Sequence, residues 1–526
     1  MRLLALAPVL ASLLAAASCG QPPSTDPAAD AAEPGLDADQ PAEERDGGST
    51  SRPDARSSWD ASRPDAGPQR PDAAASGSDA AASGPDASAS GPDASAPVPA
   101  TRFAASGLQW NVPTAGEYDW KVYETYSRHS VVDMDGDGRP DFVDSADVSG
   151  GSTVVWGSGG QQYWKVYKNN GSGFDAVPLT WKIPTAGEYD WKIYETYSRH
   201  ALVDMDGDGR PDFVDSADES GGNTAVWGSG GQQYWKVYKN NGSGFDAVPL
   251  TWKIPTAGEY DWKVDESYSR HAVLDMDGDG RPDFVDSADE SGGSTAVWGS
   301  GGQQYWKVYK NNGSGFDAVP LTWKIPTAGE YDWKVNETYS RHSLVDMDGD
   351  GRPDFVDSAD ESGGSTAIWG SGGQQYWKVY KNNGSGFDAV PLTWAIPTAG
   401  EYDWKTYDSY SRHSVLDMDG DGRPDFVDSA DQSGGSTVVW GNGGLQFWKV
   451  YKNTGTGFAA VPLQWMIPTA GEYDWKVDDS YSRHAVLDLN GDHRADFVDS
   501  EDETTAGASD VRKTGTQQFW KVFLGE

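Results

Sequence analysis

An aspartate-rich loop is the clearest sign of chemistry in this chain. Residues 133–144 read DMDGDGRPDFVD, and close copies begin at positions 204, 275, 346, 417 and 488, always at an interval of 71 residues. With the first residue counted as position 1, aspartates stand at positions 1, 3, 5 and 9 of the first copy. Alternate residues of a tight loop direct their carboxylates toward one point, and calcium takes six to eight hard oxygen ligands of this kind. The pattern therefore predicts a calcium site in each copy.

The residues around these aspartates indicate what kind of site it is. Gly136 and Gly138 permit the turn conformations that such a loop requires. The spacing through position 6 is that of an EF-hand loop, but the flanking residues, HSVV before and FVD after, are typical of strands rather than helices. The loop offers no base next to an open coordination position, which a catalytic metal needs. We therefore expect structural calcium, up to six ions, each tying down a β-hairpin.

The sixth copy departs from the other five. It reads DLNGDHRADFVD, so that Asn490 replaces the aspartate at position 3 and His493 replaces the glycine at position 6. Asn490 can still offer a side-chain oxygen. His493 must adopt a backbone conformation that glycine takes more easily. We predict that this is the weakest of the six sites.

A strict repeat must position these loops. The motif GEYDWK begins at residues 116, 187, 258, 329, 400 and 471, and six copies of a 71-residue unit fill residues 102–526. Val, Trp, Tyr and Thr dominate four segments of the first unit, which predicts strands over residues 127–134, 140–146, 153–169 and 177–184. Four strands in each of six units predict an all-β fold, a six-bladed β-propeller. Because 71 residues is long for a blade, we also expect extended loops or a fifth strand.

The two ends of the repeat region predict how the ring closes. Residues 103–115 resemble the fourth strand of a unit and precede the first aspartate loop, whereas no such element follows the sixth loop before the last residues, 518–526. The N-terminal strand can therefore complete the last blade and remove an open sheet edge. An open solenoid is the alternative, although solenoids more often carry distinct capping repeats.

The loop and its surroundings resemble a known family. The pattern D-x-D-G-D-G-x-x-D between two strands, followed by WKVYKNNGSGF at residues 164–174, is similar to the FG-GAP/VCBS repeat, the calcium-loop propeller family that includes integrin α-subunit heads. Asp144 and its equivalents at position 12 are candidates for an extra ligand. The resemblance implies side-chain ligands at positions 1, 3, 5 and 9 and a backbone carbonyl ligand at position 7. These residues are Asp133, Asp135, Asp137, Arg139 and Asp141; Asp204, Asp206, Asp208, Arg210 and Asp212; Asp275, Asp277, Asp279, Arg281 and Asp283; Asp346, Asp348, Asp350, Arg352 and Asp354; Asp417, Asp419, Asp421, Arg423 and Asp425; and Asp488, Asn490, Asp492, Arg494 and Asp496.

The N-terminal region predicts export. Residues 1–18 combine Arg2 with an apolar stretch and small residues, which is typical of a signal peptide. Cys19, the single cysteine, follows directly, and the segment AASC resembles a bacterial lipoprotein signal in which this cysteine is lipidated; ordinary cleavage that leaves a free thiol is the alternative. Residues 19–101 are rich in Asp, Ala, Ser, Pro and Gly, so we expect a disordered linker. The protein is thus predicted to be secreted and lipid-anchored at the bacterial cell surface or outer membrane.

Charge and histidine placement exclude some functions. A formal net charge of -40 disfavours nucleic acid and anionic membranes as partners, because both are polyanions, so contact with a membrane is expected only through the lipid anchor. The motif YSRH, at residues 126–129 of the first unit, recurs in every unit. Because a catalytic site is normally built once, we interpret it as a hydrogen-bonded blade position and predict that the protein is not an enzyme.

Aromatic residues beside polar ones suggest where a ligand binds. The segment WGSGGQQYW contains five candidate ligand-binding residues, which are Trp156, Gln161, Gln162, Tyr163 and Trp164. Aromatic faces with polar neighbours stack on sugars or contact proteins, but packing between blades would equally explain the tryptophans. Any pocket exists about six times, which favours a repetitive extracellular protein or glycan ligand. We therefore expect a calcium-binding surface module for binding or adhesion; the alternatives are a multivalent lectin and a structural scaffold without a specific ligand.

Overall fold

The computed structural model describes residues 103–526 apart from two stretches that recur in each repeat. In the first repeat these stretches are residues 115–127, of which only Val122 is described, and residues 148–153. One or two positions in several hairpin turns are also left out. The predicted signal peptide, the lipidation site Cys19 and the predicted linker lie outside the described residues.

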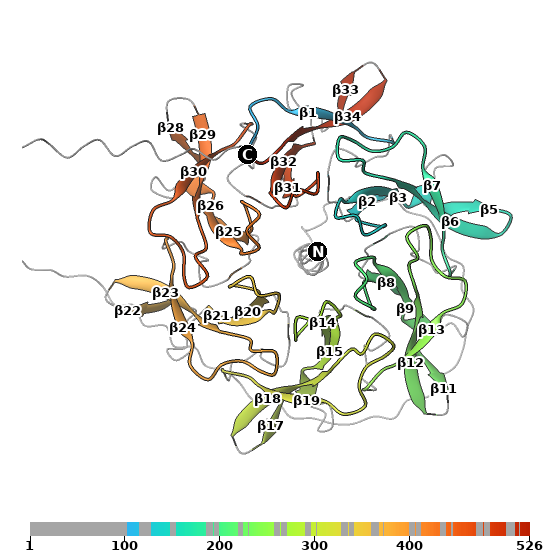
Figure 1. The fold of residues 1–526 in the computed structure, drawn as a ribbon, viewed down its shortest axis with the longest axis horizontal. Helices are drawn as coiled ribbons and strands as arrows, with labels where there is room; N and C mark the ends of the chain where they lie inside the picture. The colour runs from blue at the N-terminus through green and yellow to red at the C-terminus, as the bar shows by residue number, and fades with distance from the viewer. Residues whose placement is uncertain are drawn as a thin grey trace, which may run out of the picture. The chain divides into compact units, whose positions relative to one another are not determined.

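Each repeat contributes a sheet of antiparallel strands. In the first blade, the innermost strand β2 (His129–Val132) pairs with β3 (Asp141–Asp144), β3 pairs with β6 (Gln161–Tyr167), and β6 pairs with the outer strand β7 (Leu179–Lys182). Side chains alternate between a buried and a more exposed face along β2, as expected for half-buried strands. Six such sheets surround a common centre (Figure 1), which confirms the predicted all-β, six-bladed propeller.

The other blades repeat these four positions. The innermost strands are β8 (His200–Val203), β14 (His271–Leu274), β20 (His342–Val345), β25 (His413–Leu416) and β31 (His484–Leu487). The second strands are β9 (Asp212–Asp215), β15 (Asp283–Asp286), β21 (Asp354–Asp357), β26 (Asp425–Asp428) and β32 (Asp496–Asp499). The third are β12 (Gln232–Tyr238), β18 (Gln303–Tyr309), β23 (Gln374–Tyr380), β29 (Leu445–Tyr451) and β34 (Gln517–Phe523). The outer strands are β13 (Leu250–Lys253), β19 (Leu321–Lys324), β24 (Leu392–Ala395), β30 (Leu463–Met466) and, for the sixth blade, β1 (Leu108–Asn111).

A hairpin extension explains the length of the repeat. The single strand predicted over residues 153–169 is two strands, β5 (Val154–Ser158) and β6, because Gly159 and Gly160 form a turn with positive φ angles of 60° and 80°. A short strand β4 (Ala146–Asp147) pairs with β5. The predicted extra strand is thus confirmed. The corresponding strands elsewhere are β10 (Ala217–Asp218), β11 (Ala225–Ser229), β16 (Ala288–Asp289), β17 (Ala296–Ser300), β22 (Trp369–Ser371), β27 (Ala430–Asp431), β28 (Val438–Asn442) and β33 (Arg512–Thr514).

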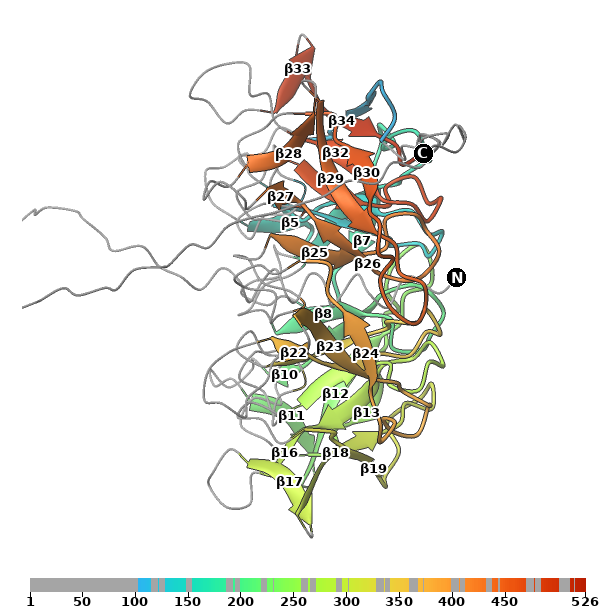
Figure 2. The same cartoon turned by 90° about the vertical axis from the view of Figure 1, so that its left-hand side faces the viewer.

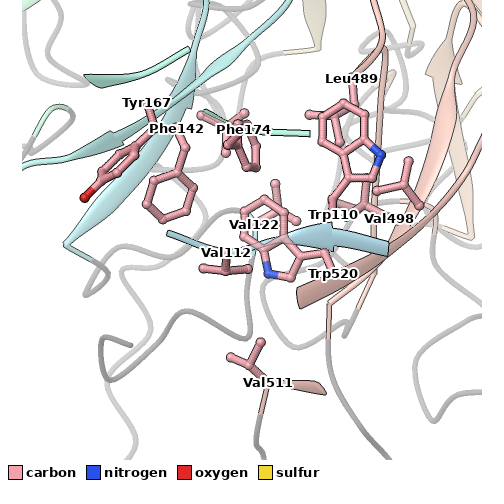
Figure 3. Close-up of a cluster of buried hydrophobic side chains, with 13 residues drawn as sticks. Trp110, Val112, Val122, Phe142, Tyr167, Phe174, Leu489, Val498, Val511 and Trp520 are labelled. Atoms are coloured by element: carbon pink, nitrogen blue, oxygen red, sulfur yellow. The ribbon is translucent and has the colours of Figure 1, made fainter. Parts of the chain in front are cut away.

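The N-terminal strand closes the ring. Strand β1 pairs antiparallel with β34 of the last repeat, with Trp110 opposite Trp520. Figure 3 shows both tryptophans in one buried cluster with Phe142 of the first blade and Val498 of the sixth. The predicted closure is therefore confirmed, and the open-solenoid alternative is wrong.

Tryptophans fill the contacts between blades. The largest fully buried side chains among the described residues are all tryptophans, two for each blade, such as Trp164 and Trp181 in the first. The Trp164 ring lies 5.9 Å from Phe213 and 6.1 Å from Phe245 of the second blade, and the Trp181 ring lies 5.4 Å from Phe245. One blade therefore packs its tryptophan face on the phenylalanine face of the next.

A buried asparagine also links neighbouring blades. The Asn240 side-chain amide donates to the carbonyl of Met134 in the preceding blade at 2.8 Å and to the carbonyl of Pro211 in its own blade at 3.0 Å. Equivalent bonds join four other pairs of blades, from Asn169, Asn311, Asn382 and Asn453. The sixth repeat has Gly525 at this position, which has no side chain to make the bond.

Candidate metal centres

The aspartate loops connect the two innermost strands of every blade. In the first blade the loop leaves β2 after Val132 and enters β3 at Asp141. Gly136 and Gly138 have φ angles of 76° and 87°, the left-handed region that glycine tolerates best. In Figure 2 most of the loops drawn in colour lie on one side of the six sheets. The short hairpin thus holds the aspartates where the sequence predicts them.

The first aspartate shapes the loop from within. Asp133 Oδ1 accepts the backbone N–H of Gly136 at 2.8 Å, and Asp133 Oδ2 accepts that of Gly138 at 2.8 Å. The Asp137 N–H also donates to Asp133 Oδ1, at 3.2 Å. Burial raises the pKa of Asp133 even though these backbone donors oppose the shift. The loop backbone therefore wraps around one carboxylate that is largely removed from water.

The aspartate at position 9 is the most deeply buried carboxylate of the site. Asp141 Oδ1 accepts the N–H of Asn169 at 2.8 Å, and Oδ2 accepts the N–H of Met134 at 3.2 Å. Burial, helped by the charges of Asp135 and Asp133, raises the pKa of Asp141 to about 8. Its equivalents in the other five loops are raised to about 7 or 8. A carboxylate that loses this much hydration gains strongly from a nearby cation.

Carboxylates converge in five of the loops. One oxygen each from Asp133, Asp135 and Asp141 lie within 4.8 Å of one another, and positions 1, 3 and 9 converge in the same way in the second, fourth and fifth blades. In the third blade the converging residues are at positions 1, 3 and 5, which are Asp275, Asp277 and Asp279.

The donor set fits a hard divalent cation. Asp135 Oδ1 is buried and has no hydrogen-bond partner, as are the equivalent oxygens of Asp348 and Asp419. Three clustered carboxylates, one of them with a free buried oxygen, form the oxygen-rich surroundings that calcium and magnesium prefer. Asp144, the candidate at position 12, ends β3 opposite His129, at the end of the strand away from the loop. It is therefore not part of this cluster. The carbonyl ligand at Arg139 stays a prediction.

Two basic side chains from the blade complete the site. The Arg139 guanidinium pairs with Asp137. The Lys168 ammonium pairs with Asp135, and this contact is the largest factor raising the lysine pKa. Lys168 follows β6 directly. Sequence reasoning missed it, although it stands inside the WKVYKNNGSGF motif that signalled the family resemblance.

The sixth loop keeps the shape of the others. His493 has a φ of 72° and is the one non-glycine residue with positive φ in the described part of the chain, as predicted for its position. Its N–H still donates to Asp488 Oδ2, at 2.7 Å. Asn490 stands in place of the third-position aspartate, so the loop has one carboxylate fewer. Its lower metal affinity remains a prediction.

The loops of successive blades touch one another. A Cβ atom added to Gly136 would come within 2.7 Å of the Arg210 side chain of the next blade, and one added to Gly491 would come within 2.6 Å of Arg139. The sixth loop therefore lies against the first, as the first lies against the second. The aspartate loops form a closed ring of contacts.

The candidate ligand-binding residues divide into two groups. Trp164 is fully buried between blades, which excludes it from ligand contact and corrects that prediction. Trp156 is partly exposed, but the Lys165 ammonium lies 3.0 Å from the centre of its ring and covers one face. Gln161 uses its amide group to donate to the Gln162 and Ile183 carbonyls.

Gln162 and Tyr163 remain available from that set. Both are partly exposed, and the side-chain oxygen of Gln162 is buried without a hydrogen-bond partner. In the third blade the equivalent Gln304 lines a shallow hollow of about 630 Å³ with Gln303, Ser300 and Thr327.

The repeated histidines are part of the packing. His129 is buried and stacks on Phe142, with ring centres 4.8 Å apart and planes 10° apart. The same stack occurs in the other five blades. The motif therefore supplies a core residue to each blade.

Within the described part of the chain, no helix is long and apolar enough to cross a bilayer.

No family model and no curated protein matches this sequence. Among solved structures, the Tc holotoxin pore of Photorhabdus luminescens is similar over 79% of this chain, at 15% identity and a TM-score of 0.42. A TcdB2–TccC3–Cdc42 complex is similar over 80% of this chain, at 14% identity and a TM-score of 0.31. In both cases the match covers 15% of the other, much longer chain.

Proposed function

We propose that this chain is a calcium-binding β-propeller of the FG-GAP/VCBS type that acts outside the cell as a surface binding or adhesion module. The observation that carries the calcium proposal is the convergence of three carboxylates in five loops, where a buried Asp135 oxygen has no partner. Four carboxylates in one short loop repel one another, and a divalent cation would remove that repulsion. The ion would therefore stabilise the hairpin and, through it, the blade.

A repeated apolar edge supports the binding role. Val177 is 78% exposed and Leu179, on the outer strand β7, is 41% exposed. The same pair recurs in the second, third and fourth blades at nearly the same exposure. Exposed apolar residues at regular intervals suit a repetitive partner, because weak contacts combine when a ligand spans several of them. We further propose that Cys19 is lipidated and anchors the propeller at the bacterial surface.

Chelation tests the calcium proposal. EDTA should lower the melting temperature of the purified chain and speed its digestion by trypsin, and added calcium should reverse both effects. The triple variant Asp133→Asn, Asp135→Asn and Asp141→Asn should show a smaller change in melting temperature on addition of EDTA, because the first blade no longer binds calcium. If EDTA changes neither the melting temperature nor the rate of digestion of the unaltered chain, structural calcium is refuted.

Cell binding tests the adhesion proposal. Fluorescently labelled protein should bind intact cells in calcium, and Val177→Asp with the same change at Val248, Val319 and Val390 should reduce the bound fluorescence at least tenfold. The control carries Asp175→Asn with the same change at Asp246, Asp317 and Asp388, each two residues before one of these valines on the same exposed turn. Equal binding by both variants would refute a role for this edge.

A carbohydrate ligand is the second candidate. The hollow beside Gln304 favours it, because the unpartnered glutamine oxygen can accept a hydrogen bond from a sugar hydroxyl and further polar side chains line the hollow. A glycan array would separate the two candidates. Calcium-dependent binding of a glycan that is lost in Gln304→Ala and its equivalents would favour the lectin, and binding to neither cells nor glycans would favour the scaffold.

A further inference from the structure

A lysine lies against the metal cluster in five blades. The Lys168 ammonium contacts Asp135 Oδ2, and Asp135 itself is only 10% exposed, so the ion pair sits at the edge of the buried site. The other oxygen of Asp135 has no partner. One carboxylate therefore faces both a fixed ammonium and the remaining aspartates of the cluster. The same pairs in the other blades are Lys239 with Asp206, Lys310 with Asp277, Lys381 with Asp348, and Lys452 with Asp419.

The sixth blade lacks both members of this pair. Pairing of Trp110 with Trp520 fixes the register of the last blade and places Leu524 at the position of Lys168. Asn490 stands at the position of Asp135. The first site contains four aspartates, one arginine and one lysine, which gives a net charge of -2. The sixth site contains three aspartates and one arginine, which gives the same net charge of -2. The acid and the base are both absent from the sixth blade, as expected if the lysine belongs to the site.

We propose that Lys168 and its four equivalents set the divalent-cation affinity of their loops by sharing the position-3 carboxylate with the metal. This inference rests on the proposed calcium binding. An ammonium in contact with a ligand carboxylate would repel a cation held by that carboxylate, while in the metal-free loop it offsets the repulsion among the aspartates. Its removal should therefore tighten calcium binding and destabilise the metal-free protein. A unit charge about 5 Å from a divalent ion, even at the dielectric constant of water, changes affinity by roughly tenfold.

Calorimetric titration of the full chain with calcium tests this proposal. Replacement of all five lysines by methionine, which has a similar length and no charge, should tighten calcium binding about tenfold and lower the melting temperature in EDTA. The matched control changes the lysine three residues earlier in the chain, which lies on the strand itself and whose ammonium lies over a tryptophan ring instead of the loop. Calcium affinity should not change in that control, which carries Lys165→Met with the same change at Lys236, Lys307, Lys378 and Lys449.

A charge-neutral pair of substitutions separates charge from shape. Asp135→Asn combined with Lys168→Leu in each of the five blades copies the sixth loop and keeps the net charge at -2. Its calcium affinity should be lower than that of the methionine variant and close to that of the sixth loop, because a ligand carboxylate is lost together with the lysine. If the five-blade methionine variant does not fold, Lys310→Met alone should add a single tighter site to the titration, because only the third blade is changed.

The outcomes separate this inference from the proposed function. Tighter calcium binding in the methionine variants but not in the control supports the inference. If the unaltered chain binds calcium and the methionine variants bind it equally or more weakly, the inference is wrong and the calcium proposal stands. If neither the unaltered chain nor the methionine variants bind calcium, both are wrong.

Discussion

The asparagine that joins neighbouring blades should be essential to the stability of the ring. Replacement of Asn240 by alanine removes three hydrogen bonds: two donated to the carbonyls of Met134 and Pro211, and one accepted from the Gly242 N–H at 2.8 Å. The site is buried, so water cannot replace them freely. Each buried polar group left unpaired costs about 1–3 kcal/mol. We therefore expect Asn240→Ala to lower the free energy of unfolding by about 3 kcal/mol or more.

The adjacent Asn241 provides a matched control. It is exposed, and its side chain bonds only within its own turn, to Asp246 and Ser243. Asn241→Ala should cost less than about 1 kcal/mol. Urea unfolding followed by tryptophan fluorescence gives the two values, and hydrogen exchange should show faster exchange at the contact between the first and second blades in Asn240→Ala. Equal stabilities of the two variants would refute the role of this link.

Three further substitutions probe the loops and the closure. Gly136→Ala should destabilise the protein by about 1–3 kcal/mol more than Gly138→Ala in thermal unfolding. Both residues have positive φ, but only a Cβ atom on Gly136 would meet a neighbouring side chain. Equal effects of the two substitutions would contradict this contact. His493→Gly should raise the free energy of unfolding by about 0.5–1 kcal/mol, because glycine adopts the positive φ of 72° without strain. A lower melting temperature would show that contacts of the histidine side chain stabilise the loop by more than the backbone strain destabilises it. Trp110→Ala should cost about 3–5 kcal/mol, since this fully buried ring lies in the closing strand, and a cost under 1 kcal/mol would show that closure adds little.

The architecture could be predicted because its signals are local and repeated. The period of the aspartate loop defines the blade, and the extra fourth-strand segment before the first loop predicts the closure that β1 and β34 make. The error in the third strand has a local cause. Gly159 and Gly160 form a two-residue turn in positive φ, a common hairpin connection that splits the segment into β5 and β6.

The site was predictable only where its residues are close in sequence. Asp133, Asp135 and Asp141 belong to one hairpin, so their spacing alone brings them together. Lys168 comes from a segment about 30 residues later, and the pairing of β3 with β6 determines where it lies. No spacing rule within the loop could have indicated it.

Strand alternation decides the roles of the aromatic residues. Trp164 and Val166 lie two residues apart on β6 and share its buried face, so the tryptophan is a core residue. Trp156 stands opposite Tyr163 on the other face of the sheet, where it is partly exposed. The sequence shows this alternation of the side chains. It does not show which face of the sheet the next blade covers, because that depends on how the sheets are arranged.

Native mass spectrometry of the purified chain in calcium counts the calcium ions that each molecule holds. We expect five tightly held calcium ions, from the loops that begin at Asp133, Asp204, Asp275, Asp346 and Asp417, and a sixth, more weakly held ion from the loop at Asp488. EDTA should remove all six, and Asp133→Asn with Asp135→Asn and Asp141→Asn should reduce the count by one. If the protein has the same mass in calcium and in EDTA, the loops do not hold calcium.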